Sequence, residues 1–477
     1  MTSVKKIIIF IICISFLITL SEIVLNFGLS NFILLTSCLL LLIVSVPIFY
    51  SKTDNVFSIL PYLFYFLFLN VFLRNLYIIH DLPSVDYVRD VFLFSENIEF
   101  IFNYQLIILL SFFFFILGYL FIPESKFSRV RGVKELKWDH FRFNIIATFL
   151  LLTSLSSLIY FIYSSNSNLF VITLENISGY RGVSDDLADY NANGLSRILI
   201  QLSVVLFYLS FVRRKFINKS LLNNIFLLLS GSIALFYFFY TQSRSGFIYL
   251  FINCFILNYF IDEKGISKKR ILILFFIVIS SFAFMTSLRN GNGYNLEQNL
   301  ESSILSIFDP LVANNGGIDI SKTGHIIKYV DTKDSYKYGS SYIWIIQSFV
   351  PRSLWSSKPA NIDTEVGFKI YDANSYGTGA VPPGLIAESY WNFGYIGIVF
   401  VSLICGISLK KLTNYFNRKI NHIDTLIIYV VCIMPIGLSL YGSSVSSTIV
   451  GILYYLIPFL IVFKFVNKQQ INNVIKL

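Results

Sequence analysis

The sequence predicts an all-α polytopic membrane protein with about twelve transmembrane helices and one long extracytoplasmic loop before the tenth. Composition is the first observation, because 55% of the 477 residues are hydrophobic and only 13% are charged, whereas soluble proteins carry about 25% charged residues. The second is a series of apolar runs near the roughly 20 residues that cross a bilayer. The third is the distribution of Lys and Arg between alternate connecting segments. Together they predict a single membrane domain over residues 1–477.

Twelve apolar segments have the length and composition of membrane spans. They cover residues 7–26, 30–50, 57–73, 104–122, 144–163, 196–212, 221–240, 245–261, 271–288, 391–409, 424–440 and 446–464. The first could be a signal peptide, but no small-residue cleavage site follows it and a second span begins at once. We therefore expect an uncleaved helix.

The charge pattern orients these spans with both termini in the cytoplasm. In that orientation the cytoplasmic segments hold 24 of the 37 Lys and Arg but only 7 of the 27 Asp and Glu. The net charge is then +17 inside and −7 outside, which gives the +10 of the whole chain. The basic balance reflects topology, so no nucleic-acid partner is needed to explain it.

Neither a metal nor another cofactor is expected. The five cysteines fall inside predicted spans without C-x-x-C spacing, and none of the four histidines has a second ligand at metal spacing. The glycines of "SLRNGNGYN" follow no strand and do not form a G-x-G-x-x-G motif. Dinucleotide binding is therefore excluded as well.

Three outer segments carry most of the polar residues outside the spans: residues 74–103, 164–195 and 289–390. A loop as long as residues 289–390 is usually functional inside a compact bundle. It contains the apolar patch "YIWIIQSFVPRSLW" at 342–355, which is too short to span. Two interpretations stay open for this patch: an interfacial helix at headgroup level, or a lid that packs on the bundle.

Four arginines lie at or beyond the predicted outer ends of spans. They are Arg244 in "TQSRSG", Arg181 in "SGYRGV", Arg289 in "SLRNG" and Arg352 in "VPRSLWSSKP", where Lys358 follows. Guanidinium groups bind phosphate oxygens in pairs and stay charged at physiological pH. Several of them on one side of the membrane therefore favour a phosphate-containing ligand.

Arg244 has two interpretations. If the seventh span continues to it, Tyr237, Tyr240, Thr241 and Arg244 form one polar stripe facing the bundle, because they are spaced i, i+3, i+4 and i+7. Otherwise it is an arginine that snorkels to the interface, as is common at helix ends. An ionisable group at membrane depth favours the functional interpretation.

Glu388 enters the tenth span among apolar residues, in "GLIAESYWNFGYIGI". Burial would raise the pKa of its carboxyl and a nearby arginine would lower it. Two roles stay open: a general base on a hydroxyl nucleophile, or an anchor that holds an arginine in place.

The sequence resembles a known family in the order and placement of three segments. "SRSG" opens the eighth span, and "PRSLWSSKP" and "ESYWNFGYIG" follow in the long loop and at the start of the tenth span. This arrangement is similar to that of the bacterial O-antigen and capsular repeat-unit polymerases of the Wzy type. The resemblance implies a GT-C-like, metal-independent membrane glycosyltransferase at the outer face of the bacterial cytoplasmic membrane.

The expected substrates are undecaprenyl-diphosphate-linked oligosaccharide repeat units, as donor and acceptor, and a polysaccharide chain-length regulator is an expected partner. The resemblance implies that Arg244 and Arg352, with Glu388, are catalytic. It implies that Arg181, Arg289, Lys358, Tyr180 and Tyr390 bind diphosphate or sugar, although a structural role is the default for a tyrosine in so aromatic a chain. One departure is clear: the family's R-x10-G motif is not reproduced, since twelve residues separate Arg181 from Gly194 and fourteen separate Arg352 from Gly367.

Two other functions remain as alternatives. An O-antigen ligase has a similar number of spans and similar outer arginines, but it delivers the polymer to another acceptor. A flippase or exporter of lipid-linked oligosaccharide would carry charges through the middle of several spans. The predicted spans here are nearly free of mid-span charges, which favours chemistry at the outer face.

Overall fold

The structure is a computed structural model that describes residues 3–25, 28–51, 57–80, 98–125, 138–165, 195–216, 220–241, 243–262, 318, 320–350, 354–355, 357–371, 380–419 and 422–467. Throughout these ranges the regular elements are helices, and the one β-type contact is an isolated antiparallel bridge between Trp138 and Asn467. The prediction of an all-α chain is confirmed.

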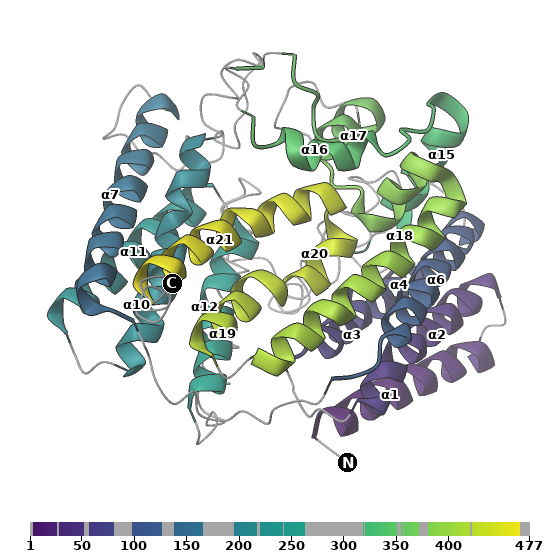
Figure 1. Cartoon of the computed structure of the whole chain (residues 1–477). Coiled ribbons are helices and arrows are strands. Elements are labelled where there is room, and N and C mark those ends of the chain that lie inside the picture. Colours follow the sequence, from purple (N-terminus) through teal and green to yellow (C-terminus); the bar gives the residue numbers. More distant parts are fainter. Residues whose placement is uncertain are drawn as a thin grey trace, which may run out of the picture.

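The helices follow the chain as shown in Figure 1. They are α1 (Ser3–Leu25), α2 (Leu29–Tyr50), α3 (Ile59–Leu67), the π-helix η1 (Phe68–Leu73), α4 (Arg74–Ile79), α6 (Ile98–Phe121), α7 (His140–Ser165), α10 (Leu202–Phe216), α11 (Leu221–Tyr240), α12 (Arg244–Ile261), α15 (Ile320–Lys333), α16 (Ser340–Gln347), α17 (Ile362–Ile370), α18 (Gly384–Lys419), α19 (Ile423–Ile428), the π-helix η2 (Tyr429–Ile433), α20 (Ile436–Gly442) and α21 (Val445–Val466).

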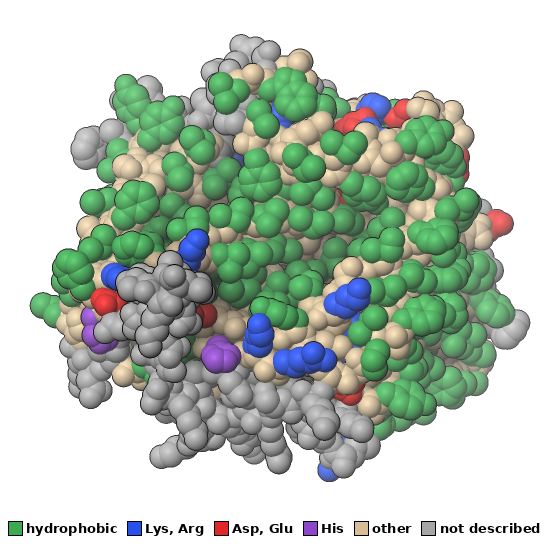
Figure 2. Space-filling view, in the orientation of Figure 1, with side chains coloured by type: hydrophobic (Ala, Val, Ile, Leu, Met, Phe, Trp, Pro, Cys, Tyr) green, Lys and Arg blue, Asp and Glu red, His purple; other side chains and the backbone are tan. Residues whose placement is uncertain are grey.

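Nine helical segments in the described residues are long and apolar enough to cross a membrane. Eight of them match predicted spans to within five residues, and the ninth, Gly384–Lys419, extends beyond the predicted span 391–409 at both ends. The predicted span 245–261 is α12, which is apolar but shorter, and the predicted span 424–440 is divided among α19, η2 and α20. The predicted span 271–288 lies outside the described residues. The lipid-facing side is visible in Figure 2 as a broad band of hydrophobic side chains.

Close contact between α6 and α18 forms the centre of one half of the bundle. A methyl group added at Gly118 or Gly406 would collide with the backbone carbonyl of Leu403 or Phe115. Beside this contact, Ser111 Oγ and Ser402 Oγ share a buried hydrogen bond of 2.8 Å. Small residues allow membrane helices to approach in this way, because lipid gives apolar side chains no preference for protein.

One end of the bundle is closed by polar contacts around Asp424. Trp138 Nε1 donates to Asp424 Oδ1 at 2.8 Å, and Asn467 Nδ2 donates to Asp424 Oδ2 at 2.6 Å. These bonds join the starts of α7 and α19 to the end of α21. Figure 2 shows Lys, Arg and His side chains gathered near this end.

The opposite end carries α15, α16 and α17, which Figure 1 shows grouped above the starts of α18 and α21. All three helices belong to the predicted long outer loop, residues 289–390. The patch 342–355 combines features of both interpretations offered for it. Ser341 of α16 is buried and Phe349 contacts the ring of Tyr454 on α21, while Ile343 and Ile346 are exposed.

Candidate functional site

A carboxylate cluster lies where α18 and α21 begin, beneath α16 and α17. We define this cluster as Glu388, Asp363, Ser341, Asn392 and residues 444–447. Glu388, Asn392, Ser444 and Ser446 are fully buried, and Ser341 and Asp363 are also buried. Because buried polar groups are costly unless they are hydrogen-bonded, the contacts of this cluster define what it can do.

Glu388 accepts hydrogen bonds on both carboxylate oxygens. Ser341 Oγ and Ser446 Oγ donate to Oε1 at 2.9 and 3.2 Å, and the backbone N–H of Val445 donates to Oε2 at 2.5 Å. Val445 is the first residue of α21, so the carboxylate lies at the positive end of a helix dipole. Glu388 therefore joins three elements: α16, α18 and α21.

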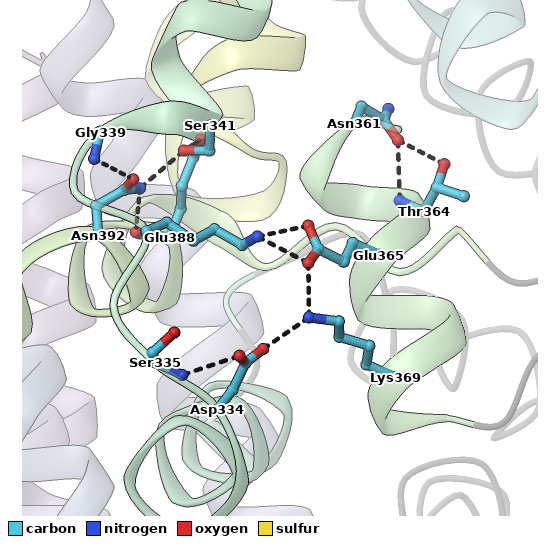
Figure 3. A network of polar contacts seen from close by, with 11 residues as sticks. Asp334, Ser335, Gly339, Ser341, Asn361, Thr364, Glu365, Lys369, Glu388 and Asn392 are labelled. Atoms are coloured by element: carbon cyan, nitrogen blue, oxygen red, sulfur yellow. Dashed lines mark hydrogen bonds and ion pairs between the residues drawn. The ribbon is translucent and has the colours of Figure 1, made fainter. Parts of the chain in front are cut away.

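Asn392 fixes the direction of the Ser341 hydroxyl, as Figure 3 shows. Its Nδ2 donates to Ser341 Oγ at 2.7 Å and to the backbone carbonyl of Glu388 at 2.8 Å. Since the serine oxygen accepts from the amide, its own proton is left for Glu388 Oε1. The Asn392 Oδ1 accepts from the N–H of Gly339 at 2.9 Å.

The α18 helix breaks just after Asn392. Phe393 and Gly394 have non-helical dihedrals, and Gly394 has φ 63° and ψ −150°, a conformation essentially restricted to glycine. The carbonyls freed near the break accept from the chain before α16: Lys337 N–H donates to Trp391 O at 2.8 Å and Tyr338 N–H donates to Asn392 O at 3.1 Å. Exposed irregular backbone is not tolerated in lipid, so this docking makes the break possible.

An ion-pair network lies beside the cluster on α17 and the end of α15 (Figure 3). Glu365 binds Lys337 at 2.6 Å and Lys369 at 2.9 Å, and Lys369 also binds Asp334 at 2.8 Å. Burial alone would raise the pKa of Asp334, but the hydrogen bonds from Lys369 and from the N–H of Ser335 bring it below its usual value. The network holds α17 against α15.

Asp363 is the second carboxylate of the cluster, in the first turn of α17. Its Oδ2 accepts from Ser447 Oγ at 2.6 Å. Burial raises the pKa of the Asp363 carboxyl, while hydrogen bonds from Ser447 and Ser444 and the charge of Lys322 act in the opposite direction. Lys322 itself is 1% exposed, so an anion and a cation are buried together here.

No metal site is visible in the part of the chain that the structure describes, where no three His, Cys, Asp or Glu side chains gather closely enough to hold an ion. The polar atoms of the cluster are hydroxyls, one amide and two carboxylates. Such a set can accept hydrogen bonds from hydroxyl groups and can accept a proton.

A family model described as "O-antigen polysaccharide polymerase Wzy" matches residues 7–471, nearly the whole chain. The chain belongs to this family. A curated relative, Protein CapE of Staphylococcus aureus, is 25% identical over 164 residues, which are 33% of this chain and 32% of CapE. The match thus spans about a third of CapE's length. No solved structure matches the chain.

Membership of the Wzy family implies a polymerase activity of the glycosyltransferase type. The structure describes some of the residues that were predicted to carry this activity. Glu388 lies in the carboxylate cluster as described above, and within the described residues no arginine contacts it. Arg181, Tyr180, Arg289 and Arg352 lie outside the described residues.

Lys358 and Tyr390 do not belong to the cluster. Lys358 Nζ donates to the carbonyls of Ser348 and Val350 at 3.1 and 3.0 Å, at the C-terminal end of α16. Tyr390 is 2% exposed and its hydroxyl donates to Asp331 Oδ1 at 2.5 Å. Its ring packs edge-on against Tyr336 and Tyr395, which fits the structural role that is the default for a tyrosine.

The predicted polar stripe that ends at Arg244 is wrong. The seventh span ends at Tyr240, and a new helix, α12, begins at Arg244. Ser243 causes the change because it is the N-cap of α12, where its hydroxyl accepts from the N–H of Gly246 at 3.4 Å. Arg244 is therefore the first residue of a helix in a tight turn, rather than the end of a stripe on α11.

Sequence reasoning missed Arg197, which lies near this turn. Its guanidinium is 5.4 Å from the centre of the Phe161 ring and interacts electrostatically with Tyr237, one turn before the end of α11. Its buried Nε has no hydrogen-bond partner among the described residues. We call Thr241, Ser243 and Arg244, together with Arg197, the arginine turn. The signal was present: like Arg244, Arg197 begins an apolar run.

Asp363 and Lys322 were missed as well. No motif used in the sequence analysis singles out either residue. Asp363 gains its significance from its contact with α21, whose residues lie far away in the sequence.

Proposed function

We propose that this chain joins lipid-linked oligosaccharide repeat units into an O-antigen or capsular polysaccharide at the outer face of the bacterial cytoplasmic membrane. The growing chain is transferred from its undecaprenyl diphosphate to an incoming lipid-linked unit. The observation that carries this proposal is the family match over residues 7–471. The positive-inside pattern of the sequence supports the orientation, because it places α15 to α17 and the carboxylate cluster outside.

The arginines are proposed to bind the diphosphate. Arg244, Arg352, Arg181 and Arg289 hold this role, with Lys358 and Arg197 in support. The start of α12 supports it further, because the first N–H groups of a helix and its dipole favour an anion beside Arg244. Cations placed at a leaving diphosphate stabilise the charge that develops as the glycosidic bond breaks, and no metal is needed for this.

Glu388 is proposed to be a positioning residue that holds neighbouring groups of the site in place. Both of its oxygens are already bound, so its carboxylate holds the starts of α18 and α21 and the hydroxyl of Ser341 in place. The GT-C-like architecture and the binding of a chain-length regulator remain parts of the same proposal, as do sugar contacts by Tyr180 and Tyr390.

Purified full-length protein mixed with lipid-linked repeat units provides the test. The probe is the repeat unit that accumulates in membranes of the source strain after deletion of this gene. We expect a ladder of products whose lengths differ by one repeat unit. Transfer only to another lipid acceptor would instead identify a ligase, and movement across a vesicle membrane without bond formation would identify a flippase.

A further inference from the structure

The two carboxylates of the cluster differ in the hydrogen bonding of one oxygen atom. Both oxygens of Glu388 accept hydrogen bonds from neighbouring residues. Asp363 Oδ2 accepts from Ser447 Oγ, whereas Oδ1 is buried without a hydrogen-bond partner among the described residues. The side chain is only 9% exposed, so bulk water does not replace the missing donor.

A buried carboxylate oxygen without a donor is costly, by about 1–3 kcal/mol or more for a charged group. Such sites persist where a ligand group completes them. The ligand group that fits one carboxylate oxygen is a hydroxyl, which is also the nucleophile that the polymerase reaction requires.

The groups around Asp363 favour a role for its carboxylate as a general base. The charged groups that face Asp363 are Lys322 from α15 and Glu388 from α18, while α21 contributes the hydroxyls of Ser444 and Ser447. Burial raises the pKa of the Asp363 carboxyl and makes it a stronger base than an exposed aspartate, while the hydroxyls of Ser447 and Ser444 and the charge of Lys322 favour its ionised form.

We propose that Asp363 Oδ1 accepts the proton of the attacking sugar hydroxyl. This rests on the polymerase function proposed above. The acceptor O–H bond breaks and its proton passes to Oδ1, while the oxygen forms a new bond to the anomeric carbon of the donor. The bond between that carbon and the lipid diphosphate breaks, and its electron pair leaves with the diphosphate. The proton is later released to water.

A purely structural role is the competing explanation, because an acidic residue in the first turn of a helix stabilises the helix dipole. Glu365 also lies in the first turn of α17 and serves as a matched control. Loss of either charge weakens the helix, whereas loss of Asp363 also removes the proton acceptor.

The experiment compares Asp363→Asn with Glu365→Gln in the ladder reaction, with turnover given per folded protein and donor binding measured separately. We expect Asp363→Asn to lose at least about 100-fold in turnover, the usual contribution of a positioned base, with donor affinity unchanged within about twofold. Glu365→Gln should retain wild-type turnover per folded protein. The inference is overturned if Asp363→Asn retains more than a tenth of the turnover. If the wild type itself builds no ladder, the proposed function fails instead.

A second variant covers the case in which Asp363→Asn does not fold. Ser447→Ala removes the hydrogen bond that lowers the pKa of Asp363 and leaves Oδ1 untouched. Turnover needs the ionised carboxylate, so it rises with pH through the pKa of Asp363, and in Ser447→Ala this rise should move to higher pH. A pH profile identical to that of the wild type would contradict a proton-accepting role.

Discussion

The carboxylate cluster and the arginine turn differ in how their charges are satisfied. Each oxygen of Glu388 on α18 accepts a hydrogen bond, and the donors come from two other helices, α16 and α21. Arg197, in contrast, has an aromatic ring as its neighbour and a buried Nε without a hydrogen-bond partner in the described ranges. The difference separates two tasks. Glu388 is held in place by its neighbours, whereas we propose that an anionic ligand completes the contacts of the arginine turn.

The largest effect is expected at the arginine turn. Arg244→Ala should reduce turnover by about 100-fold or more, because a pre-positioned donor at a developing charge is worth that much. Cells carrying this variant should display single repeat units in place of long polysaccharide, as gel electrophoresis of the extracted glycans would show. Arg418→Ala, which changes an exposed arginine near the end of α18, is the control and should leave chain length unchanged. A normal chain-length distribution in Arg244→Ala would remove Arg244 from the diphosphate site.

Glu388→Gln tests whether the cluster acts by position. The amide would bring an N–H group against the N–H of Val445 or lose a hydrogen bond from a serine, at a cost of about 1–3 kcal/mol. We expect a lower melting temperature in detergent and reduced turnover, while donor binding is retained. Glu99→Gln, at an exposed glutamate of α6, is the control for loss of charge. An unchanged melting temperature together with full activity would show that Glu388 has no positioning role.

Arg197→Ala should have a smaller effect, confined to donor binding. Removing one charge-assisted contact to phosphate costs about 1.5 kcal/mol, so the donor dissociation constant should rise about tenfold. Arg197→Lys keeps the charge and should recover part of the affinity. If Arg197→Ala binds the donor as tightly as the wild type, the arginine turn does not include this residue.

Ser402→Ala measures how much an ordinary buried hydrogen bond contributes to the stability of this bundle. It removes the bond to Ser111 between α6 and α18, and such bonds average about 0.6 kcal/mol in membrane proteins. We expect a small loss of thermal stability and no change in turnover. A loss as large as that of Glu388→Gln would mean that the cluster is no more tightly held than the rest of the bundle.

Most of the fold could be predicted because membrane spans are encoded locally. An apolar run of sufficient length becomes a helix wherever it meets lipid, and nine of the predicted spans are present, eight of them at nearly the predicted positions. The end of α11 at Tyr240 coincides with the end of the predicted span 221–240, although Tyr237, Tyr240 and Thr241 continue a helical pattern toward Arg244. The cap at Ser243 accounts for the new helix that starts there.

The candidate site could be predicted only in part, for the opposite reason. Glu388 was recognisable as a carboxyl group in an apolar run. Asp363, in contrast, is one of two acidic residues in an ordinary helix start, and its partner Ser447 is 84 positions away. The break at Gly394 depends in the same way on the chain before α16. Such pairings follow from tertiary packing, and local patterns do not contain them.

The division of tasks is tested most directly by the equilibrium binding of radiolabelled lipid-linked repeat units to purified Arg244→Ala and Asp363→Asn proteins. Both variants are expected to lose turnover. Binding should be lost in Arg244→Ala and retained in Asp363→Asn, since the proposed role of the first is to contact the diphosphate and that of the second is to accept a proton only during transfer. Normal binding by Arg244→Ala, or loss of binding by a folded Asp363→Asn, would contradict this division.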